Sequence, residues 1–536
     1  MLRDAADPVN LANGEFTYSN TFMQIPGVKN PYEFSLTYRN QLPYDGPVGN
    51  KFDHNYNMFL VESTGAVNFF NGKLGVFNFP QASTGTGYDY NKGLKAKLSK
   101  DSTSGLYALT FDNGTRYLFG ANLKVSKMTD RYGNALVFAY NADKQLTTVT
   151  DTLGRDVTYT YNSDTRLQKV TESGGRSVKL SYFASGDTGG GANDLKSVTI
   201  KSGTDSKTIS YTYDANHNIA TLTDSKGQVY VNNTFDANGR VTSQKYGTGT
   251  VNYVYTLTGS TAPGASAQSV YQNDVTNANG VHTQYTYDSN ENTVKREIFD
   301  SVGTGSTVYS YAYDTNARLQ KSTLPKGNGT SYQYDARGNI TMERQKTSAK
   351  AADNNTTDLV TTYQYDGVFD VPVKVTLPNG LVKTFTLDGS GNVLSQTASG
   401  ILNPDGTSYA TTLGYSYDSI GQLIQKTDGE GNTTSYTYAS GQLVSVTQGT
   451  GSTAIQETFN YDAYGNLVSS TDGEGKTKFL TYNPFNLVAN SKTAEGIETR
   501  FTYDANNNKT REEKYTLADG VIGATDYTYD NLDHVT

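Results

Sequence analysis

Apolar and aromatic residues alternate with polar ones over short stretches of the chain, and these stretches follow a recurring pattern. The unit is an aromatic residue, any residue, Tyr-Asp, a turn with Gly or Asn, and then a Leu or β-branched position, as in Tyr415-Ser416-Tyr417-Asp418. Side chains two positions apart lie on the same face of a strand, so Tyr415 and Tyr417 are expected to share one face. Each unit therefore predicts an antiparallel β-hairpin.

The unit that begins at Tyr415 shows how one hairpin is completed. Residues 418–422 supply a turn in which Gly421 suits a positive φ, and residues 423–427 form the returning strand. A second turn follows at residues 428–431, with the sequence Asp-Gly-Glu-Gly. Two strands of roughly five to eight residues and two turns fit this spacing.

The unit recurs through most of the chain. When the second aromatic residue is taken as the anchor, the sequence contains eighteen anchors: Phe119, Tyr140, Tyr161, Tyr182, Tyr213, Phe235, Tyr255, Tyr287, Tyr313, Tyr334, Tyr365, Leu387, Tyr417, Tyr438, Tyr461, Tyr482, Tyr503 and Tyr529. Of the seventeen gaps between anchors, seven are 21 residues and four are 30 to 32 residues. Stretches at residues 184–194, 258–268 and 346–357, rich in Ser, Gly, Ala and Asp, are expected to be loop insertions between hairpins.

The number of hairpins constrains the architecture. Eighteen hairpins give about 36 strands, and at about 4.8 Å per strand the sheet would be about 170 Å wide. Open twisted sheets rarely exceed about ten strands, so the sheet must wind on itself or stack. A ring closed in one turn would have a bore of about 50 Å, which side chains cannot fill. We therefore predict an all-β fold, a long spiralling antiparallel sheet of β-hairpins that forms a hollow shell.

The chain divides into two parts by composition. Residues 1–110 lack the repeat and hold six of the twelve prolines, which predicts an N-terminal β-rich segment of short strands and loops. Residues 111–536 are predicted to form the repeat shell. Because Tyr529 is followed by only seven residues, the chain is expected to stop within a repeat and to be part of something longer.

Composition and charge agree with a thin wall more than with a filled globule. The chain has 536 residues, of which 35% are hydrophobic and 42 are tyrosines, and it has no cysteine. The net charge is −8 and no dense cluster of Lys and Arg occurs, so nucleic-acid binding is not expected. No apolar run approaches 18 residues and no signal peptide is visible, so membrane insertion is not expected. Export, to the medium or the cell surface, would then need a segment outside this chain or a dedicated secretion machinery.

The residue types that usually carry chemistry are scattered. The four histidines are far apart in the sequence and are expected to be surface or turn residues: His54, His217, His282 and His534. The recurring aspartates follow a strand tyrosine, where an Asx-type turn bond is a better explanation than acid/base catalysis. They include Asp214, Asp314, Asp335, Asp418, Asp462 and Asp504.

Other motifs are weaker still. Residues 428–432 and 472–475 resemble calcium loops but lack the alternating ligands and the distal Glu of such loops. Residues 389–391, Gly-Ser-Gly, are a poor match to a phosphate loop and fall within a predicted turn. We predict no catalytic, cofactor-binding or metal-binding residue, no cofactor, and no enzymatic activity.

The tyrosine rows admit two interpretations. Cross-strand aromatic pairs stabilise hairpins by roughly 0.2–1 kcal/mol each, which is enough to explain the tyrosines. Exposed tyrosines beside Asn, Gln and Thr would also suit stacking on sugar rings. The first interpretation is preferred because the hairpins need these residues in any case.

The motif Tyr-x-Tyr-Asp-x-x-Gly followed by Arg, Asn or Gln resembles the YD repeats of the Rhs family, which includes bacterial polymorphic toxins, toxin-complex shell proteins, wall-associated proteins and teneurins. Residues 7–10, 14–16 and 34–40 are similar to the domain that commonly precedes bacterial YD repeats, and residues 46–49 and 54–57 continue the likeness. One departure is Phe52-Asp53, where relatives usually carry Gly-Trp. The resemblance covers nearly the whole chain.

The resemblance implies a function. Relatives form a spiralling cocoon around their own C-terminal toxic domain, which autoproteolysis by a core region releases. The Asp-Pro of that core motif occurs here only as Asp7-Pro8, so neither the protease nor a toxin is visible. The leading hypothesis is a non-catalytic shell segment that encloses a C-terminal cargo of a secreted protein, with the N-terminal segment as a plug or brace. The alternative is an extracellular adhesion or surface-fibre module that binds glycans or copies of itself.

Overall fold

The computed structural model describes residues 9–83, 87–247, 249–257, 270–300, 304–347, 357–402, 407–530 and 532–536. The described chain is built from β-strands, with one short 3-10 turn, η1 (Gly451–Thr453). The predicted all-β class is therefore confirmed. The part of the chain described here contains no helix long and apolar enough to cross a membrane. The insertion expected at residues 258–268 and most of the one at 346–357 lie outside the described residues.

The N-terminal segment holds eight short strands. They are β1 (Thr17–Ile25), β2 (Tyr32–Arg39), β3 (Asp45–Gly46), β4 (Gly49–Asn50), β5 (Phe52–His54), β6 (Met58–Ser63), β7 (Ala66–Asn71) and β8 (Val76–Pro80). Strands β1, β2 and β5 form one sheet, β6, β7 and β8 a second, and β3 and β4 a small ribbon. We refer to residues 9–83 as the N-terminal domain.

A single antiparallel sheet of 37 strands makes up the rest. Its first strands are β9 (Ala96–Lys100), β10 (Tyr107–Phe111), β11 (Arg116–Phe119), β12 (Val125–Thr129), β13 (Ala135–Tyr140), β14 (Leu146–Thr150), β15 (Asp156–Tyr161), β16 (Leu167–Glu172), β17 (Ser177–Tyr182), β18 (Leu195–Ser202), β19 (Asp205–Tyr213), β20 (Ile219–Thr223), β21 (Val229–Phe235), β22 (Val241–Tyr246), β23 (Gly249–Leu257), β24 (Val270–Thr276) and β25 (His282–Tyr287). We call these strands the first wind. Strand β9 lies before residue 111 and β10 ends at it, so the long sheet begins earlier in the chain than the repeat motif does.

The second wind continues the same sheet. It comprises β26 (Thr293–Phe299), β27 (Ser306–Tyr313), β28 (Leu319–Thr323), β29 (Gly329–Tyr334), β30 (Ile340–Lys346), β31 (Leu359–Tyr365), β32 (Pro372–Thr376), β33 (Val382–Leu387), β34 (Val393–Leu402), β35 (Ser408–Tyr417), β36 (Leu423–Thr427), β37 (Thr433–Ala439), β38 (Gln442–Gln448), β39 (Ile455–Tyr461), β40 (Leu467–Thr471), β41 (Thr477–Tyr482), β42 (Val488–Lys492), β43 (Glu498–Tyr503), β44 (Lys509–Thr516) and β45 (Gly520–Asp526).

The hairpins form as the repeat predicts. In the hairpin of β35 and β36, Tyr415 pairs with Lys426 and Tyr417 pairs with Leu423, with a bulge between Ser416 and Tyr417. The turn that joins the two strands holds Gly421 at φ 82°, as its sequence predicts. The same bulge recurs at the corresponding place in most other hairpins, for example before Tyr161 and Tyr503. A repeated sequence thus gives a repeated backbone.

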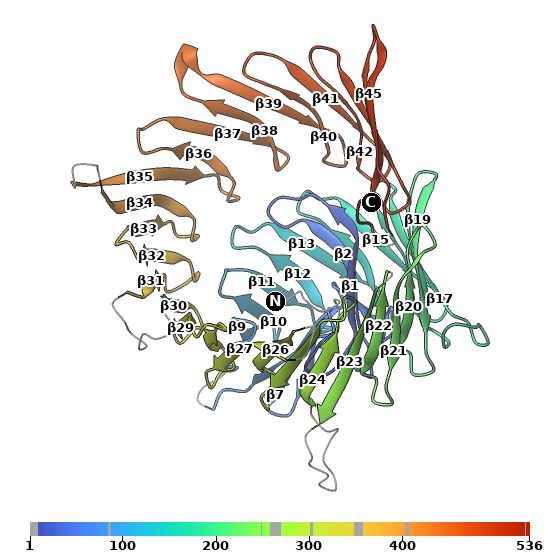
Figure 1. The fold of residues 1–536 in the computed structure, drawn as a ribbon. Coiled ribbons are helices and arrows are strands. Elements are labelled where there is room, and N and C mark those ends of the chain that lie inside the picture. The colour runs from blue at the N-terminus through green and yellow to red at the C-terminus, as the bar shows by residue number, and fades with distance from the viewer. Residues whose placement is uncertain are drawn as a thin grey trace.

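The long sheet curls into a spiral, as predicted (Figure 1). Its last strands, drawn in orange and red, arc back over the teal and green strands of the first wind. The hydroxyl of Tyr464, in the turn between β39 and β40, donates to the carbonyl of Gly174 at 3.0 Å, in the turn between β16 and β17. At this contact one complete revolution of the spiral takes 23 strands, more than either group of strands named above, and at about 4.8 Å per strand this corresponds to a circumference of about 110 Å.

The N-terminal domain packs against the concave face of the first wind. Phe34, Tyr38 and Phe52 are completely buried and share one hydrophobic core with Tyr159 and Tyr211 of the wall. Phe52 is the first residue of the Phe52-Asp53 departure from the usual Gly-Trp, and its ring packs 4.9 Å from the ring of Tyr38 and 5.5 Å from that of Tyr211. The Phe52 side chain is thus accommodated by aromatic packing.

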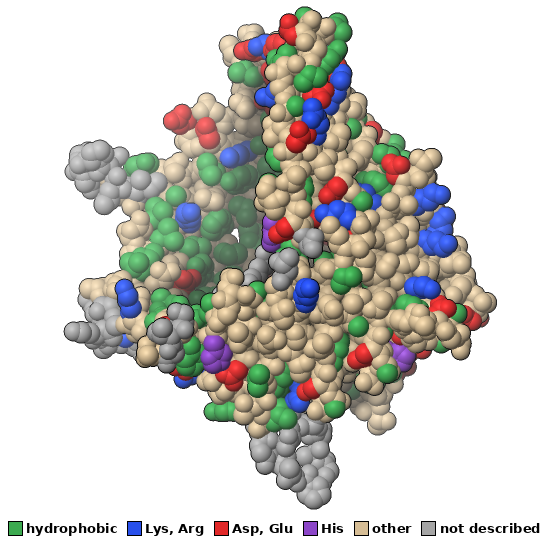
Figure 2. Space-filling view, turned by 45° about the vertical axis from the view of Figure 1, so that its right-hand side comes forward, with side chains coloured by type: hydrophobic (Ala, Val, Ile, Leu, Met, Phe, Trp, Pro, Cys, Tyr) green, Lys and Arg blue, Asp and Glu red, His purple; other side chains and the backbone are tan. Residues whose placement is uncertain are grey.

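The two winds differ in what covers their concave face. Every buried apolar side chain of the described chain lies between Val9 and Tyr287, and the described second wind has none. Figure 2 shows the resulting hollow at the left of the molecule, lined by hydrophobic side chains with a few charged ones among them. The first wind is therefore filled by the N-terminal domain, and the second wind encloses open space.

Candidate functional site

The anchor tyrosines join neighbouring strands through their hydroxyls. Tyr438 on β37 donates to the carbonyl of Leu423 at the start of β36, at 3.0 Å. The sequence interpretation assigned these tyrosines to aromatic pairing and did not find this bond. The preference for Tyr over Phe at the anchor was the available signal, since only Tyr has a hydroxyl. The same bond is made by Tyr140, Tyr161, Tyr182, Tyr213, Tyr255, Tyr313, Tyr334, Tyr365, Tyr461, Tyr482, Tyr503 and Tyr529.

The recurring aspartates form Asx-type turns, which confirms the structural interpretation. In the turn after β36, one oxygen of Asp428 accepts the backbone N–H groups of Glu430 and Asn432, each at 2.9 Å. Its other oxygen accepts the amide of Asn432 at 2.9 Å, and these hydrogen bonds lower the pKa of Asp428. Backbone N–H groups two and four residues on bond in the same way to Asp214, Asp314, Asp335, Asp418, Asp462 and Asp504.

The two calcium-like loops and the Gly-Ser-Gly sequence are turns of this kind. Asp472 accepts the backbone N–H groups of Glu474 and Lys476, and Asp388 accepts those of Ser390 and Asn392. Within the described ranges, no three His, Asp or Glu side chains gather in a way that could hold a metal ion.

The four histidines lie at separate places. His217 contacts Asp194 at 2.9 Å, His282 contacts Asp274 at 2.9 Å, and His534 contacts Asp530 at 3.2 Å. His54 differs from the surface position expected for it, because it lies on β5 with 1% of its surface exposed. Burial lowers the pKa of His54 to about 3, so its imidazole is neutral.

The N-terminal domain is bonded to turns of the first wind. The hydroxyl of Tyr38 donates to the carbonyl of His217 at 2.9 Å and accepts the N–H of Ile219 at 3.0 Å. The amide of Asn40 donates to the carbonyl of Gly239 at 2.6 Å. Backbone bonds join Leu167 to Pro47 at 2.7 Å and Val241 to Gly14 at 3.0 Å. The domain and the first wind thus form one packed unit.

Comparison with protein families accounts for both parts of the chain. Residues 6–79 match the family described as "Domain of unknown function (DUF6531)", and residues 140–177, 417–454 and 439–477 match the family "RHS Repeat". These matches agree with the Rhs/YD-repeat family predicted from the sequence. Among curated proteins, none matches the sequence.

Solved structures share the fold of this YD-repeat protein. The crystal structure of TcdB2-TccC3 without its hypervariable C-terminal region has a TM-score of 0.57 and 11% identity over 94% of this chain. The structure of TcdB2-TccC3 gives 0.57 and 10% over 98%, and the Tc holotoxin pore of Photorhabdus luminescens gives 0.56 and 11% over 94%. The chain spans only 27%, 29% and 27% of those chains, respectively. The likeness establishes the shell fold.

The concave face of the YD-repeat wall changes character between the winds. Two residues that pair across neighbouring strands lie on the same face of the sheet. The residue paired with the first aromatic residue of each motif therefore shows whether the concave face is apolar or polar at that point. From β11 to β20 these partners are apolar: Met128, Val149, Val170, Val198 and Leu222. From β27 to β44 they are Ser322, Glu343, Val375, Gln396, Lys426, Val446, Ser470, Ser491 and Glu512.

This change follows the position of the N-terminal domain. The partners are apolar from β11 to β20, where that domain covers the wall, and seven of the nine partners in the second wind are polar or charged. Charged side chains are seldom buried unless they are paired. The second wind therefore presents an aromatic and polar surface that is suited to a hydrated chamber.

Proposed function

We propose that this chain is a non-catalytic shell segment of an Rhs-type secreted protein, and that its second wind encloses a C-terminal cargo. The observation that carries the proposal is the uncovered concave face of the second wind, which borders the hollow in Figure 2 and whose strands pair aromatic residues with polar and charged ones. If the second wind packed against a fixed domain, we would expect its concave face to carry the same apolar residues as the concave face of the first wind.

The N-terminal domain supports the proposal as a plug. It occupies the bore of the first wind and is hydrogen-bonded to several of its turns, so that end of the spiral is blocked by protein. A plug at one end and a chamber at the other suit a container. The hydrogen bonds of the anchor tyrosines, which tie the two strands of most hairpins together, suit a wall that must stay closed.

The nature of the cargo follows by analogy. One solved relative is described as lacking a hypervariable C-terminal region, and another as a Tc holotoxin pore. We infer that the cargo here is a toxin domain that follows the shell in the same polypeptide. We also infer that the protein acts outside the cell that makes it, after export by a secretion machinery.

Protection from proteolysis tests the proposal. A flexible polypeptide with a protease site would be fused behind Thr536, and the same polypeptide inserted at the exposed residue Thr204 would serve as the control. The expected result is cleavage at least about tenfold slower behind Thr536, with added density inside the hollow in electron micrographs. Equal cleavage rates and an empty hollow would contradict the proposal.

A further inference from the structure

The two winds meet along a line of turns, which we call the seam. Four contacts across it lie progressively further apart in the sequence, by 244, 286, 290 and 307 residues. They are Lys95 with Asn339 at 2.6 Å, Asn134 with the carbonyl of Ile420 at 3.2 Å, Tyr464 with the carbonyl of Gly174 at 3.0 Å, and Lys226 with Asp533 at 2.8 Å. The ladders described within each wind instead join a strand to the next one along the chain. The seam is thus held by side chains.

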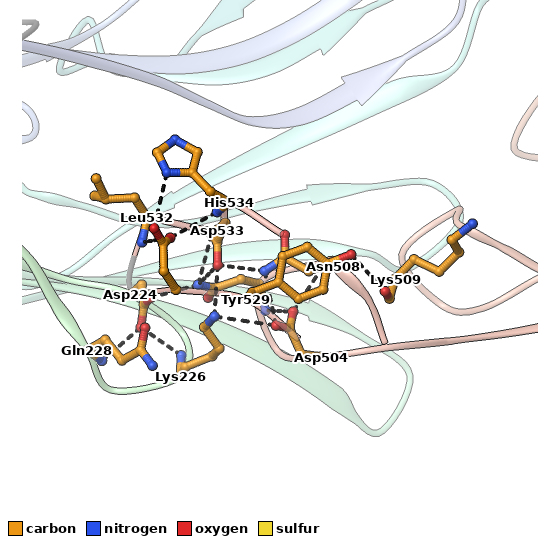
Figure 3. Close-up of polar contacts among 12 residues, drawn as sticks. Asp224, Lys226, Gln228, Asp504, Asn508, Lys509, Tyr529, Leu532, Asp533 and His534 are labelled. Carbon is orange, nitrogen blue, oxygen red and sulfur yellow. Dashed lines mark hydrogen bonds and ion pairs between the residues drawn. The ribbon is translucent and has the colours of Figure 1, made fainter. Parts of the chain in front are cut away.

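Ionic contacts lie near both ends of the seam. Near the C-terminus, the ammonium of Lys226 contacts Asp533 at 2.8 Å and Asp504 at 3.4 Å, and the amide of Asn506 donates to Asp224 at 2.6 Å (Figure 3). At the other end, the guanidinium of Arg337 lies 3.5 Å from Asp112 of the first wind. The Lys226 side chain is 17% exposed, so these charges lie close to solvent.

Each turn at the seam is also complete without its partner. One oxygen of Asp224 accepts the backbone N–H groups of Lys226 and Gln228, and one oxygen of Asp504 accepts those of Asn506 and Asn508. The contacts across the seam use the remaining oxygens and amides. Separation would therefore hydrate these side chains and leave both turns folded.

Two cavities interrupt the packing along the seam. Cavities of about 420 Å³ and 380 Å³ lie between the winds, the first beside Asp224 and Asn506 and the second beside Leu153 and Asp462. Aromatic rings that cross the seam also contact cations, because the ammonium of Lys207 lies 4.4 Å from the centre of the Phe485 ring and the guanidinium of Arg176 lies 5.5 Å from that of Tyr464. Charged groups therefore contribute to the closing free energy together with apolar packing. Contacts between partly exposed charges are weak and are screened by salt.

We propose that the seam is a separable latch, along which the second wind swings away from the first as an intact sheet when the ionic contacts weaken. The hinge is the continuous sheet through β25 and β26, where no seam contact is needed. Opening would give access to the hollow from the side. Its use as an exit for cargo rests on the proposed function, whereas the opening itself is a property of this chain alone.

Cysteine cross-linking tests the latch, because the chain has no native cysteine. Ser173→Cys and Ala463→Cys would place thiols on two exposed positions in turns that meet at the Tyr464–Gly174 contact. The rate of bismaleimide cross-linking then reports a closed seam. We expect it to fall about tenfold between 0.1 M and 1 M salt, over which the Debye length shortens from about 10 Å to about 3 Å.

Removal of the ionic contacts should act like salt. In the Lys226→Met/Arg337→Met variant we expect slow cross-linking already at 0.1 M salt, with an unchanged β-sheet circular dichroism signal. Lys476→Met is the matched control, because Lys476 pairs with Glu474 in its own turn and leaves the seam intact. A cross-linking rate unaffected by salt in the unsubstituted background would overturn the proposal, even if the double variant failed to fold. Intact encapsulation with a rigid seam would contradict the latch without affecting the proposed function.

Discussion

The hydroxyls of Tyr32 and Tyr159 share a hydrogen bond of 2.6 Å, although the two residues are 127 positions apart. Tyr32 belongs to the N-terminal domain and Tyr159 to the wall, and both are buried. The bond therefore lies at the contact between the N-terminal domain and the first wind. It stands in an aromatic core that includes Phe34, whose ring centre is 6.1 Å from that of Tyr159.

Removal of either hydroxyl should leave the other buried without a partner. We expect Tyr32→Phe and Tyr159→Phe each to cost about 1–3 kcal/mol of the free energy of unfolding. The double substitution should cost less than the sum, because no orphaned hydroxyl remains. Urea unfolding of the four proteins measures this coupling, and strictly additive costs would show that the two hydroxyls act independently.

A tyrosine of the second wind tests the hydroxyl bonds of the wall itself. Tyr438→Phe removes the bond to the carbonyl of Leu423, and we expect a loss of about 0.5–1.5 kcal/mol. Tyr436→Phe is the control, because no such bond is described for the first tyrosine of the same motif. Thermal unfolding should rank the variants with Tyr438→Phe below Tyr436→Phe, and equal midpoints would contradict the assigned role.

At turn positions with a positive φ, substitution of glycine by alanine and of alanine by glycine should change the stability in opposite directions. Ala317 has φ 58° at the turn position that Gly338 and Gly421 occupy in other units, and Gly431 has φ 89° with open space where a Cβ would stand. A left-handed conformation costs a non-glycine residue roughly 1–2 kcal/mol. We expect Gly431→Ala to lower the unfolding midpoint and Ala317→Gly to raise it by a smaller amount, since glycine also gains freedom in the unfolded chain. Shifts of the same sign in both variants would be inconsistent with this account.

Asp53 and His54 should give stability an unusual pH dependence. Burial raises the pKa of Asp53 from 3.8 to about 7 and lowers that of His54 from 6.5 to about 3. The stability that Asp53 contributes is present below its unfolded pKa and is lost as pH rises through 7. The stability that His54 contributes is present above 6.5 and is lost as pH falls through 3.

These two contributions oppose each other between about pH 4 and 6.5. There the unfolded chain binds one more proton at His54 and one fewer at Asp53, so stability should be nearly flat with respect to this pair. Asp53→Asn should leave a slope of about 1.4 kcal/mol per pH unit, with stability rising with pH. His54→Phe should leave the opposite slope. Denaturant titrations between pH 4 and 7 provide the measurement, and parallel curves for both variants would refute the pairing.

The sequence predicts the hairpins well because their determinants are local. Tyr417, Asp418 and Gly421 lie within five residues, and together they define a strand end, an Asx turn and a positive φ. The same locality explains why the six recurring aspartates could be assigned to turns. A local pattern that repeats is the part of a fold that sequence carries most directly.

The number of strands in one wind could not be predicted in this way. The contact between Tyr464 and Gly174 depends on the small twist and curl added at each of 23 strands, and on the N-terminal domain in the bore. Burial of His54 was missed for a related reason, because the surrounding rings come from Phe34 and Tyr159, far away in the sequence. Long-range packing of this kind leaves little trace in a single sequence.

Most anchor tyrosines donate to a carbonyl 14 to 25 residues earlier, and this has a consequence for how the protein is made. A hairpin can finish its hydrogen bonds as soon as its own tyrosine is available, without waiting for later parts of the chain. Proteins dominated by such short-range contacts fold quickly, and chains fold from the N-terminus as they are synthesised. The N-terminal domain would then fold first and act as the template against which the first strands pack. The rest of the wall would form one repeat at a time.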